Sequence, residues 1–138
     1  ANRGENISVI FVNNAVYGMT GGQMAPTTPD GGKTTTSPRG RNPLNEGHPI
    51  KVAELLANFE RVVYSARVSL SSPKNIRETK RAIAKSFETQ LAEKGFSIVE
   101  ILSPCPTYWH MSPEASLEYI DKTMTKVFPT AIFKDWEK

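Results

Sequence analysis

Three short apolar segments, each separated from the next by a helical pattern, limit the folds that this chain can adopt. They are ISVIFV (residues 7–12), RVVYSARV (residues 61–68) and SIVEIL (residues 97–102), and the first is apolar almost throughout. Runs of this kind suit strands that are buried on both faces, as in a parallel sheet. Strands that alternate with helices are joined by right-handed crossovers. We therefore expect an α/β fold, a parallel sheet with helices on both faces.

The segments between and after these strands carry helix signals. IKVAELLANF (residues 50–59) predicts a short helix. Ser72-Pro73 and Ser112-Pro113 each pair an N-cap side chain with a proline suited to the first helical turn. The expected order is strand, long loop, helix, strand, helix, strand, helix. The residues after 128 show no clear pattern.

The two longer helices each show apolar residues at helical spacing. In the first helix, the residues that share one face are Ile76, Ile83, Phe87 and Leu91. In the second helix, the corresponding residues are Leu117, Ile120, Met124 and Val127. Gly95 is expected to end the first of these helices, because the left-handed position after a helix favours glycine.

Three strands leave a sheet with an exposed edge, which is a liability in solution. The sequence also starts without Met and within a few residues of its first strand. We therefore expect further strands upstream. We also expect the chain by itself to associate with a second copy or with another subunit.

Charge and composition argue against a nucleic-acid-binding or membrane protein. The net charge is +3, and the Lys and Arg of KNIRETKRAIAK (residues 74–85) share their helix with Glu78, Glu88 and Glu93. Mixed charges of this kind favour a solvated face over a nucleic-acid surface. No apolar run approaches the roughly 20 residues of a membrane helix, and the N-terminus has no signal-peptide pattern. We expect no membrane contact and a cytoplasmic location.

Residues 20–49 form a loop tract that contains five prolines, six glycines and six threonines. So long a stretch without regular structure either binds something or is disordered. The tract has few groups to bury. We therefore expect it to be poorly ordered until a ligand and a neighbouring subunit hold it.

Asn13 and Asn14 end the first strand, and TGGQ (residues 20–23) follows closely. Open parallel sheets bind ligands beyond the carboxyl ends of their strands. Glycines let the backbone approach a phosphate, and a neutral amide oxygen suits Mg²⁺. The pattern indicates a magnesium–diphosphate site, although on residue types alone a simple turn is the commoner explanation. The Walker loop and the dinucleotide fingerprint are both absent.

Cys105 lies between two prolines and is the single cysteine of the chain, so it cannot form an internal disulfide. It can be a nucleophile, a metal ligand or an inert thiol, and chemistry alone favours the inert thiol. His110 follows, but one Cys and one His at this spacing make a poor metal signature. His48, between Gly47 and Pro49, is expected to be a loop residue.

Two longer stretches carry a family likeness. NNAVYGMTGGQMAPTTPDGGKTTTSPRGR (residues 13–41) and SFETQLAEKGFSIVEILSPCPTYW (residues 86–109) resemble the thiamine-diphosphate (β) subunit of the 2-oxoacid:ferredoxin oxidoreductases. The likeness covers essentially the whole chain, and YGMTGGQ followed by PTT is highly specific. It is similar to the branched-chain (2-oxoisovalerate) type and its 2-oxoglutarate relatives, and less similar to the pyruvate type.

The resemblance implies which residues hold the cofactor. In such enzymes the Asp of a G-D-G motif and the second Asn of a later N-N pair bind Mg²⁺, together with a backbone carbonyl two residues further on. This assigns Asn14 as a side-chain ligand and Val16 as the carbonyl ligand, beside Asn13. The residues that would line the cofactor and substrate pocket are Tyr17, Gly18, Thr20, Gly21, Gly22 and Gln23. The residues before Asn13 contain no Asp, so residues 1–138 are expected to be the C-terminal portion of the domain, without its G-D-G half.

The resemblance also changes the interpretation of Cys105. In this family three cysteines of the N-terminal half and one late cysteine in an S-P-C context hold a four-iron four-sulfur cluster. Ser103-Pro104-Cys105 matches the late ligand, which implies a cluster ligand in the intact enzyme. The three partner cysteines are absent, so the chain alone is expected to hold no cluster.

The function implied by the resemblance is oxidative decarboxylation of a 2-oxoacid to an acyl-CoA, with electrons passed to ferredoxin. The implied partners are the other oxidoreductase subunits (α, γ and δ types), ferredoxin, coenzyme A and the 2-oxoacid, and the isolated chain is expected to be inactive. The carboxylate that activates the cofactor lies outside this segment, so no catalytic acid or base is assigned. Three alternatives stay open: a fragment or split-gene product that acts only in assembly, a basic nucleic-acid-binding module, and a different thiamine-diphosphate enzyme.

Overall fold

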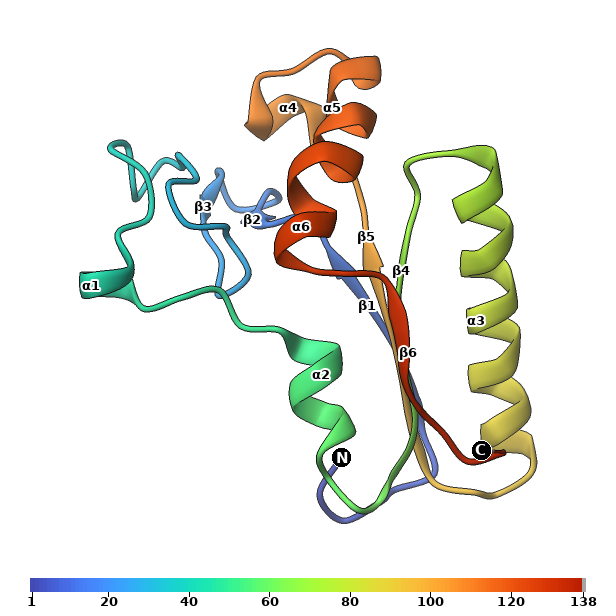
Figure 1. The fold of residues 1–138 in the computed structure, drawn as a ribbon. Coiled ribbons are helices and arrows are strands. Elements are labelled where there is room, and N and C mark those ends of the chain that lie inside the picture. Colours follow the sequence, from blue (N-terminus) through green and yellow to red (C-terminus); the bar gives the residue numbers. More distant parts are fainter. Residues whose placement is uncertain (138) are drawn as a thin grey trace.

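The computed structural model describes residues 1–137, and Figure 1 shows their arrangement. The elements, in chain order, are β1 (Ser8–Asn13), β2 (Val16–Tyr17), β3 (Gln23–Met24), α1 (Pro43–Glu46), α2 (Val52–Ala57), β4 (Val62–Ser69), α3 (Pro73–Leu91), β5 (Phe96–Leu102), α4 (Pro106–Trp109), α5 (Pro113–Tyr119), the π-helical turn η1 (Ile120–Met124), α6 (Thr125–Val127) and β6 (Ala131–Asp135). No helix in this part of the chain is long and apolar enough to cross a membrane.

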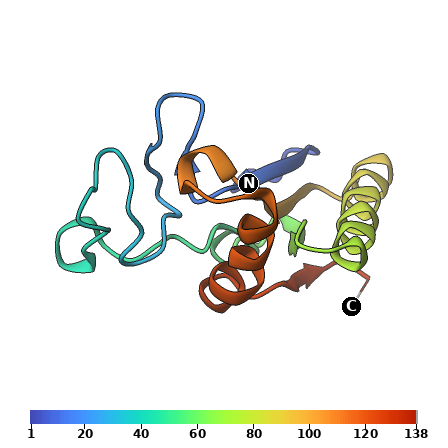
Figure 2. The same ribbon diagram turned by 90° about the horizontal axis from the view of Figure 1, so that it is seen from above.

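The main sheet has the strand order β1-β5-β4-β6 within residues 1–137. β1 and β4 both pair with β5 in parallel, as expected of the three predicted strands. The unassigned tail supplies β6, which pairs with β4 in the antiparallel direction. The sheet is therefore mainly parallel, and β1 and β6 lie at its opposite edges (Figure 2).

Helices cover both faces of the sheet, with α2 on one side and α3 on the other (Figure 1). The buried side chains between α3 and the sheet are Tyr64, Ala66, Ala82, Val99 and Ile101. Those on the α2 face are Val62, Phe96 and Ile98, with Val52 and Leu56 packed against them. Burial of this apolar surface is the main force that holds the layers together.

The predicted helix starts are confirmed. The Ser72 side chain accepts a hydrogen bond from the Asn75 backbone N–H at 3.2 Å and begins α3. Ser112 does the same for Ala115 at 3.2 Å and begins α5. Each N-cap satisfies a backbone donor that would otherwise have no partner in the first turn.

The last predicted helix is also confirmed, with a local irregularity. α5, η1 and α6 follow one another without a break from Pro113 to Val127. Ile120 and Met124 are fully buried and form a cluster with Leu102 of β5. This segment therefore covers the carboxyl end of the central strand, on the same side as α2 (Figure 1).

The end of α3 differs from the expectation. The helix stops at Leu91, and Glu93 rather than Gly95 takes the left-handed position, with φ of 53°. The Lys94 N–H donates to the Thr89 carbonyl at 3.2 Å, which closes the C-terminal turn. Gly95 has a positive φ of 135° in the connection to β5, two residues after the left-handed position at Glu93.

The core-facing side of α3 also differs from the expectation. The residues that pack against the sheet are Thr79, Ala82, Ser86 and Thr89. Of the predicted apolar face only Ile83 packs against the core, while Ile76, Phe87 and Leu91 are 39%, 50% and 84% exposed. The prediction of that face was therefore wrong. Small hydroxyl side chains let the helix approach closely, and the Thr79 hydroxyl donates to the Ser69 carbonyl at 2.9 Å.

Candidate functional site

A tight turn follows β1 at the carboxyl end of the parallel strands. Asn13 is buried, and its Oδ1 accepts a hydrogen bond from the Ala15 N–H at 3.0 Å. Ala15 has a left-handed φ of 60°, which is uncommon for a residue with a Cβ. Asn14 is half-buried, and its Oδ1 accepts a long hydrogen bond, 3.4 Å, from the Val16 N–H. This oxygen keeps a lone pair for a further partner.

The turn opens onto a cavity of about 330 Å³. Four of the predicted cofactor residues line it: Asn13, Asn14, Val16 and Tyr17. The remaining walls come from β1, from residues 25–27 and from Ile50 and Val52 at the start of α2. A largely apolar cavity with a few polar groups at one end is the common form of a small-molecule site.

The other predicted cofactor residues form the tip of a hairpin made by β2 and β3. Thr20 and Gln23 bond to each other there, the Thr20 hydroxyl donating to Gln23 Oε1 at 2.7 Å and Gln23 Nε2 donating to the Thr20 carbonyl at 2.8 Å. Gly21 and Gly22 have positive φ values of 118° and 79°. A Cβ on Gly22 would lie 2.4 Å from a ring carbon of Tyr108, so this position requires glycine.

Cys105 lies against the same hairpin, although it comes from the far end of β5. A Cβ on Gly18 would lie 3.4 Å from the Cys105 Sγ, 3.5 Å from the Tyr108 ring and 3.6 Å from Asn14 Nδ2. Gly18 is therefore the point where the turn after β1 and the segment after β5 meet. Asn14 and Cys105 approach the same small region, and Cys105 is half-buried.

A second cavity of about 330 Å³ lies on the other side of this hairpin. Its lining includes Lys33 and His110, with Tyr108, Trp109 and Tyr119. Burial raises the pKa of Tyr119. His110 is exposed and ends α4 with a left-handed φ of 53°.

A buried carboxylate lies beneath the turn. Glu100 of β5 is fully buried. Its Oε1 accepts a hydrogen bond from Asn13 Nδ2 at 2.7 Å, and its Oε2 accepts one from the Ala53 N–H of α2 at 3.0 Å. Arg67 Nε lies 3.0 Å from Oε2 without its N–H pointing at the oxygen, so this contact is an ion pair rather than a hydrogen bond.

Arg67 of β4 is itself held from several sides and is buried throughout its length. Its NH2 group donates to Glu54 Oε2 at 3.0 Å, and its NH1 group donates to the Pro129 carbonyl at 3.0 Å. The guanidinium also lies over the rings of Phe128 and Phe133, 5.4 and 5.1 Å from their centroids. Such contacts compensate the cost of burying the charge.

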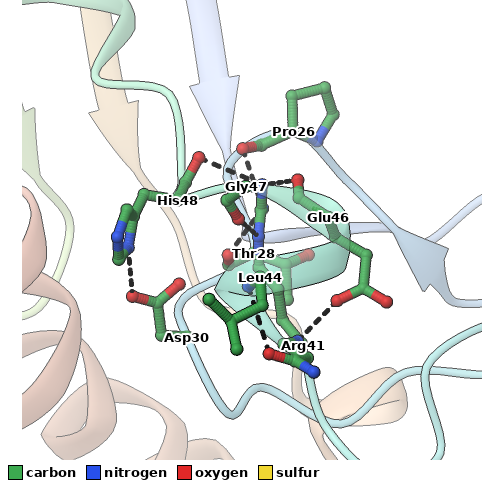
Figure 3. A network of polar contacts seen from close by, with 9 residues as sticks. Pro26, Thr28, Asp30, Arg41, Leu44, Glu46, Gly47 and His48 are labelled. Carbon is green, nitrogen blue, oxygen red and sulfur yellow. Dashed lines mark hydrogen bonds and ion pairs between the residues drawn. The ribbon is translucent and has the colours of Figure 1, made fainter.

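The loop of residues 20–49 is organised around one buried side chain (Figure 3). The five N–H groups of Arg41 donate to six backbone carbonyls, those of Ala25, Pro26, Thr28, Glu46, Gly47 and His48, at 2.7 to 3.2 Å, so that one N–H of the NH1 group is shared between two carbonyls. The short helix α1 lies within this loop. The loop therefore has a hydrogen-bonded internal framework that the sequence did not indicate, while poor order in the absence of ligand and partner stays a prediction. His48 is exposed, as a loop residue should be, with its Nδ1 2.7 Å from Asp30 Oδ2.

Four residues of this region were not singled out from the sequence. Glu100 and Arg67 could have been found, because a charged residue inside an apolar strand that is buried on both faces must be paired. Tyr108 lies in a quoted stretch, but its contact with Gly22 joins distant segments. Arg41 gave no local signal, since its six acceptors are all backbone carbonyls.

The family model for the C-terminal TPP-binding domain of thiamine pyrophosphate enzymes matches residues 1–101. The chain therefore belongs to this family of thiamine-diphosphate-binding domains. Within it, the chain is homologous over nearly its whole length to subunits of the 2-oxoacid:ferredoxin oxidoreductases.

Two curated relatives make this homology specific. The chain is 50% identical over 135 residues to ketoisovalerate oxidoreductase subunit VorA of Methanothermobacter thermautotrophicus, which is 98% of this chain and 28% of the relative. It is 36% identical over 124 residues to 2-oxoglutarate synthase subunit KorB of Archaeoglobus fulgidus, which is 90% of this chain and 42% of the relative. The chain thus spans less than half the length of these relatives.

A solved structure shares the fold. The 2-oxoglutarate:ferredoxin oxidoreductase from Magnetococcus marinus, determined with 2-oxoglutarate, coenzyme A and succinyl-CoA bound, superposes with a TM-score of 0.67 at 21% sequence identity. The match covers 98% of this chain and 49% of the solved one. At this identity the likeness supports the α/β fold.

The residues present fit part of a magnesium–diphosphate site. Asn14 supplies a neutral oxygen at the end of β1. The N–H groups of Gly21 and Gly22 already donate to the carbonyls of Gly18 and Tyr17, at 3.3 and 2.9 Å. Among residues 1–137, no group of three or more His, Cys, Asp or Glu side chains gathers where it could hold a metal ion. Further magnesium ligands, and the other thiolates of an iron–sulfur cluster at Cys105, would have to come from outside these residues.

Proposed function

We propose that this chain forms the C-terminal part of the thiamine-diphosphate site in a 2-oxoacid:ferredoxin oxidoreductase. The observation that carries the proposal is the convergence of Asn14, Gly18 and Cys105 at the carboxyl ends of β1 and β5. Ligands of parallel sheets bind at this edge. Homology to the VorA and KorB subunits supports the same function.

In this proposal the turn after β1 holds the cofactor's metal. The Asn14 Oδ1 and the Val16 carbonyl are the Mg²⁺ ligands of this chain. The hairpin of residues 17–23 covers the cofactor and keeps water from it, with Gly18 and Gly22 held against Cys105 and Tyr108. Thiamine diphosphate, when bound, supplies the carbon chemistry of decarboxylation, and the chain contributes binding and orientation.

The remaining assignments concern electrons and partners. Cys105 is proposed as one ligand of a four-iron four-sulfur cluster in the intact enzyme, close enough to Asn14 to receive electrons from the cofactor site. The partners are the other subunits of the oxidoreductase, ferredoxin and coenzyme A. No nucleic-acid role is proposed, because acidic residues lie among the basic side chains of α3, with Arg81 paired to Glu78 at 2.7 Å and Lys85 paired to Glu137.

We propose a branched-chain 2-oxoacid as the substrate. The chain is 50% identical to the ketoisovalerate subunit and 36% identical to the 2-oxoglutarate subunit. The complete complex should reduce ferredoxin faster with 2-oxoisovalerate than with 2-oxoglutarate at equal concentrations. The reverse preference would overturn the substrate assignment and leave the cofactor site unaffected.

The cofactor assignment is tested by removing the Asn14 oxygen. In the complete complex, Asn14→Ala should weaken Mg²⁺-dependent binding of thiamine diphosphate by about tenfold or more, because one of few protein ligands of the ion is lost. Asn45→Ala, an exposed asparagine on α1, is the matched control and should bind as the wild type does. Unchanged affinity in Asn14→Ala would make Asn14 a turn residue.

A second candidate function is that of an assembly partner that binds no cofactor alone. β1 has β5 as its one neighbour within residues 1–137, so its outer edge is open to a further strand. Equilibrium dialysis of the isolated chain with thiamine diphosphate and Mg²⁺ distinguishes the two. Retention of the cofactor by the isolated chain would count against the assembly function.

A further inference from the structure

The turn that presents Asn14 has a conformation that its own residues do not favour. Ala15 is buried with φ of 60°, although it carries a Cβ. Two hydrogen bonds hold it there. Its N–H donates to Asn13 Oδ1 at 3.0 Å, and its carbonyl accepts from the Thr28 hydroxyl at 2.6 Å. The position of Asn14 and Val16, which flank Ala15, therefore depends on the orientation of the Asn13 amide.

Glu100 selects that orientation. The Asn13 amide could present either its oxygen or its NH₂ group to Ala15, since the two are nearly the same size. An ionised carboxylate only accepts hydrogen bonds, so Glu100 Oε1, 2.7 Å from Asn13 Nδ2, accepts the NH₂ group and rejects the oxygen. The amide oxygen is then left to accept from Ala15.

Further contacts hold the Glu100 carboxylate in this orientation. Its second oxygen accepts from the Ala53 N–H at 3.0 Å and lies 3.0 Å from Arg67 Nε. Arg67 in turn donates to Glu54 Oε2 at 3.0 Å. Glu100 is fully buried, so water does not compete for its oxygens.

We propose that Glu100 is a positioning residue, which fixes the Asn13 amide and through it the turn that offers Asn14 Oδ1 and the Val16 carbonyl to the magnesium–diphosphate group. The inference rests on the proposed function, and it assigns Glu100 no contact with the cofactor.

The proposal predicts the outcome of an isosteric exchange. In Glu100→Gln, the new amide keeps its oxygen toward the Ala53 N–H, which donates to it, and beside the positive Arg67 guanidinium, and turns its NH₂ group toward Asn13. Asn13 must then turn its oxygen to Gln, and the Ala15 N–H loses its acceptor. In the complete complex, Mg²⁺-dependent affinity for thiamine diphosphate should fall about tenfold, the usual effect of one buried donor left unpaired.

A second exchange should restore the site. Asn13→Asp alone places two carboxylates against each other and should also weaken binding. Combined with Glu100→Gln, the Asp offers one oxygen to the Gln NH₂ group and the other to the Ala15 N–H, so both hydrogen bonds return. The double variant should bind magnesium and thiamine diphosphate within about threefold of wild type. The matched control is Glu54→Gln, which weakens the other carboxylate contact of Arg67 and should leave cofactor affinity unchanged.

The outcomes separate this inference from the proposed function. Loss in both single variants with recovery in the double variant supports the inference, and so does recovered assembly if the single variants fail to assemble. Wild-type affinity in Glu100→Gln, an equal loss in Glu54→Gln, or a double variant that binds or assembles no better than the singles would overturn it. If the wild-type complex itself bound no thiamine diphosphate, or Asn14→Ala bound normally, the proposed function would fail instead.

Discussion

At the scale of single residues, Arg41 shows how a loop of small residues acquires structure. Its guanidinium is surrounded by six backbone carbonyls of the loop (Figure 3). Planar geometry and a spread of N–H donors suit arginine to this task, whereas lysine has a compact ammonium with fewer donors. The loop beside the candidate cofactor cavity therefore depends on one side chain.

Arg41→Lys should loosen residues 20–49 while leaving the main sheet folded. Each buried carbonyl left without a donor costs roughly 1–3 kcal/mol. Hydrogen exchange measured by mass spectrometry should become at least about tenfold faster in this loop, with β4 and β5 unaffected. Arg39→Lys, at an exposed arginine two positions earlier, is the control. Equal protection of the loop in both variants would contradict the organising role of Arg41.

Cys105 gives a second prediction at this scale. In the complete complex, Cys105→Ala should lower iron content and abolish ferredoxin reduction, because the proposed thiolate ligand of the cluster is removed. Carbon dioxide release from the 2-oxoacid, assayed with an artificial electron acceptor, should continue. Full ferredoxin reduction with unchanged iron would return Cys105 to an inert thiol, the interpretation that its local chemistry favours.

At the scale of elements, the strands and helix starts could be predicted from local sequence signals, whereas the contacts between elements could not. The apolar runs identified β1, β4 and β5 because a buried strand needs such a run, and Ser72 and Ser112 marked helix starts because capping is local. β6 was not predicted, because it forms by pairing with β4, a strand distant in sequence, and not from a local pattern. The face of α3 was misjudged because a helix can approach a sheet through small hydroxyl residues and leave its larger apolar ones outside.

The same distinction between local signals and long-range contacts applies to the candidate site. The Asn pair and the glycines lie close together in sequence, so they could be proposed as a site from a local pattern. Glu100, Arg67 and Tyr108 act on them from other strands and from α4, and their contacts exist only in the folded chain. A buried charge in a strand was the available clue.

At the scale of the whole molecule, one side of the sheet remains open. Ile10 and Val12 of the edge strand β1 are exposed, on the same side of the strand as Ser8, which bonds to Ser86 of α3. The exposed Phe87 and Leu91 of α3 add to the apolar surface on this side of the sheet. An unpaired edge beside apolar side chains favours association.

The isolated chain should therefore self-associate in a concentration-dependent manner. Replacing both Phe87 and Leu91 with Ser should lower the average mass measured by light scattering and leave the circular dichroism spectrum unchanged, because neither side chain is buried in the core. Leu44→Ser, on the distant helix α1, is the control and should have no effect on mass. A strictly monomeric wild-type chain at high concentration would contradict this prediction.

Mn²⁺ in place of Mg²⁺ tests the assignment of Asn14 to a metal–diphosphate site. Aqueous Mn²⁺ gives a sharp paramagnetic resonance spectrum that is lost when the ion is bound, so the free ion can be counted in the complete complex. With thiamine diphosphate present, the wild-type complex and Asn45→Ala should remove Mn²⁺ from solution in proportion to the number of chains. Asn14→Ala should leave most of it free, since the ion loses a ligand that an alanine methyl cannot replace. Equal Mn²⁺ uptake by Asn14→Ala and the wild type would show that the metal is held elsewhere and would contradict the account.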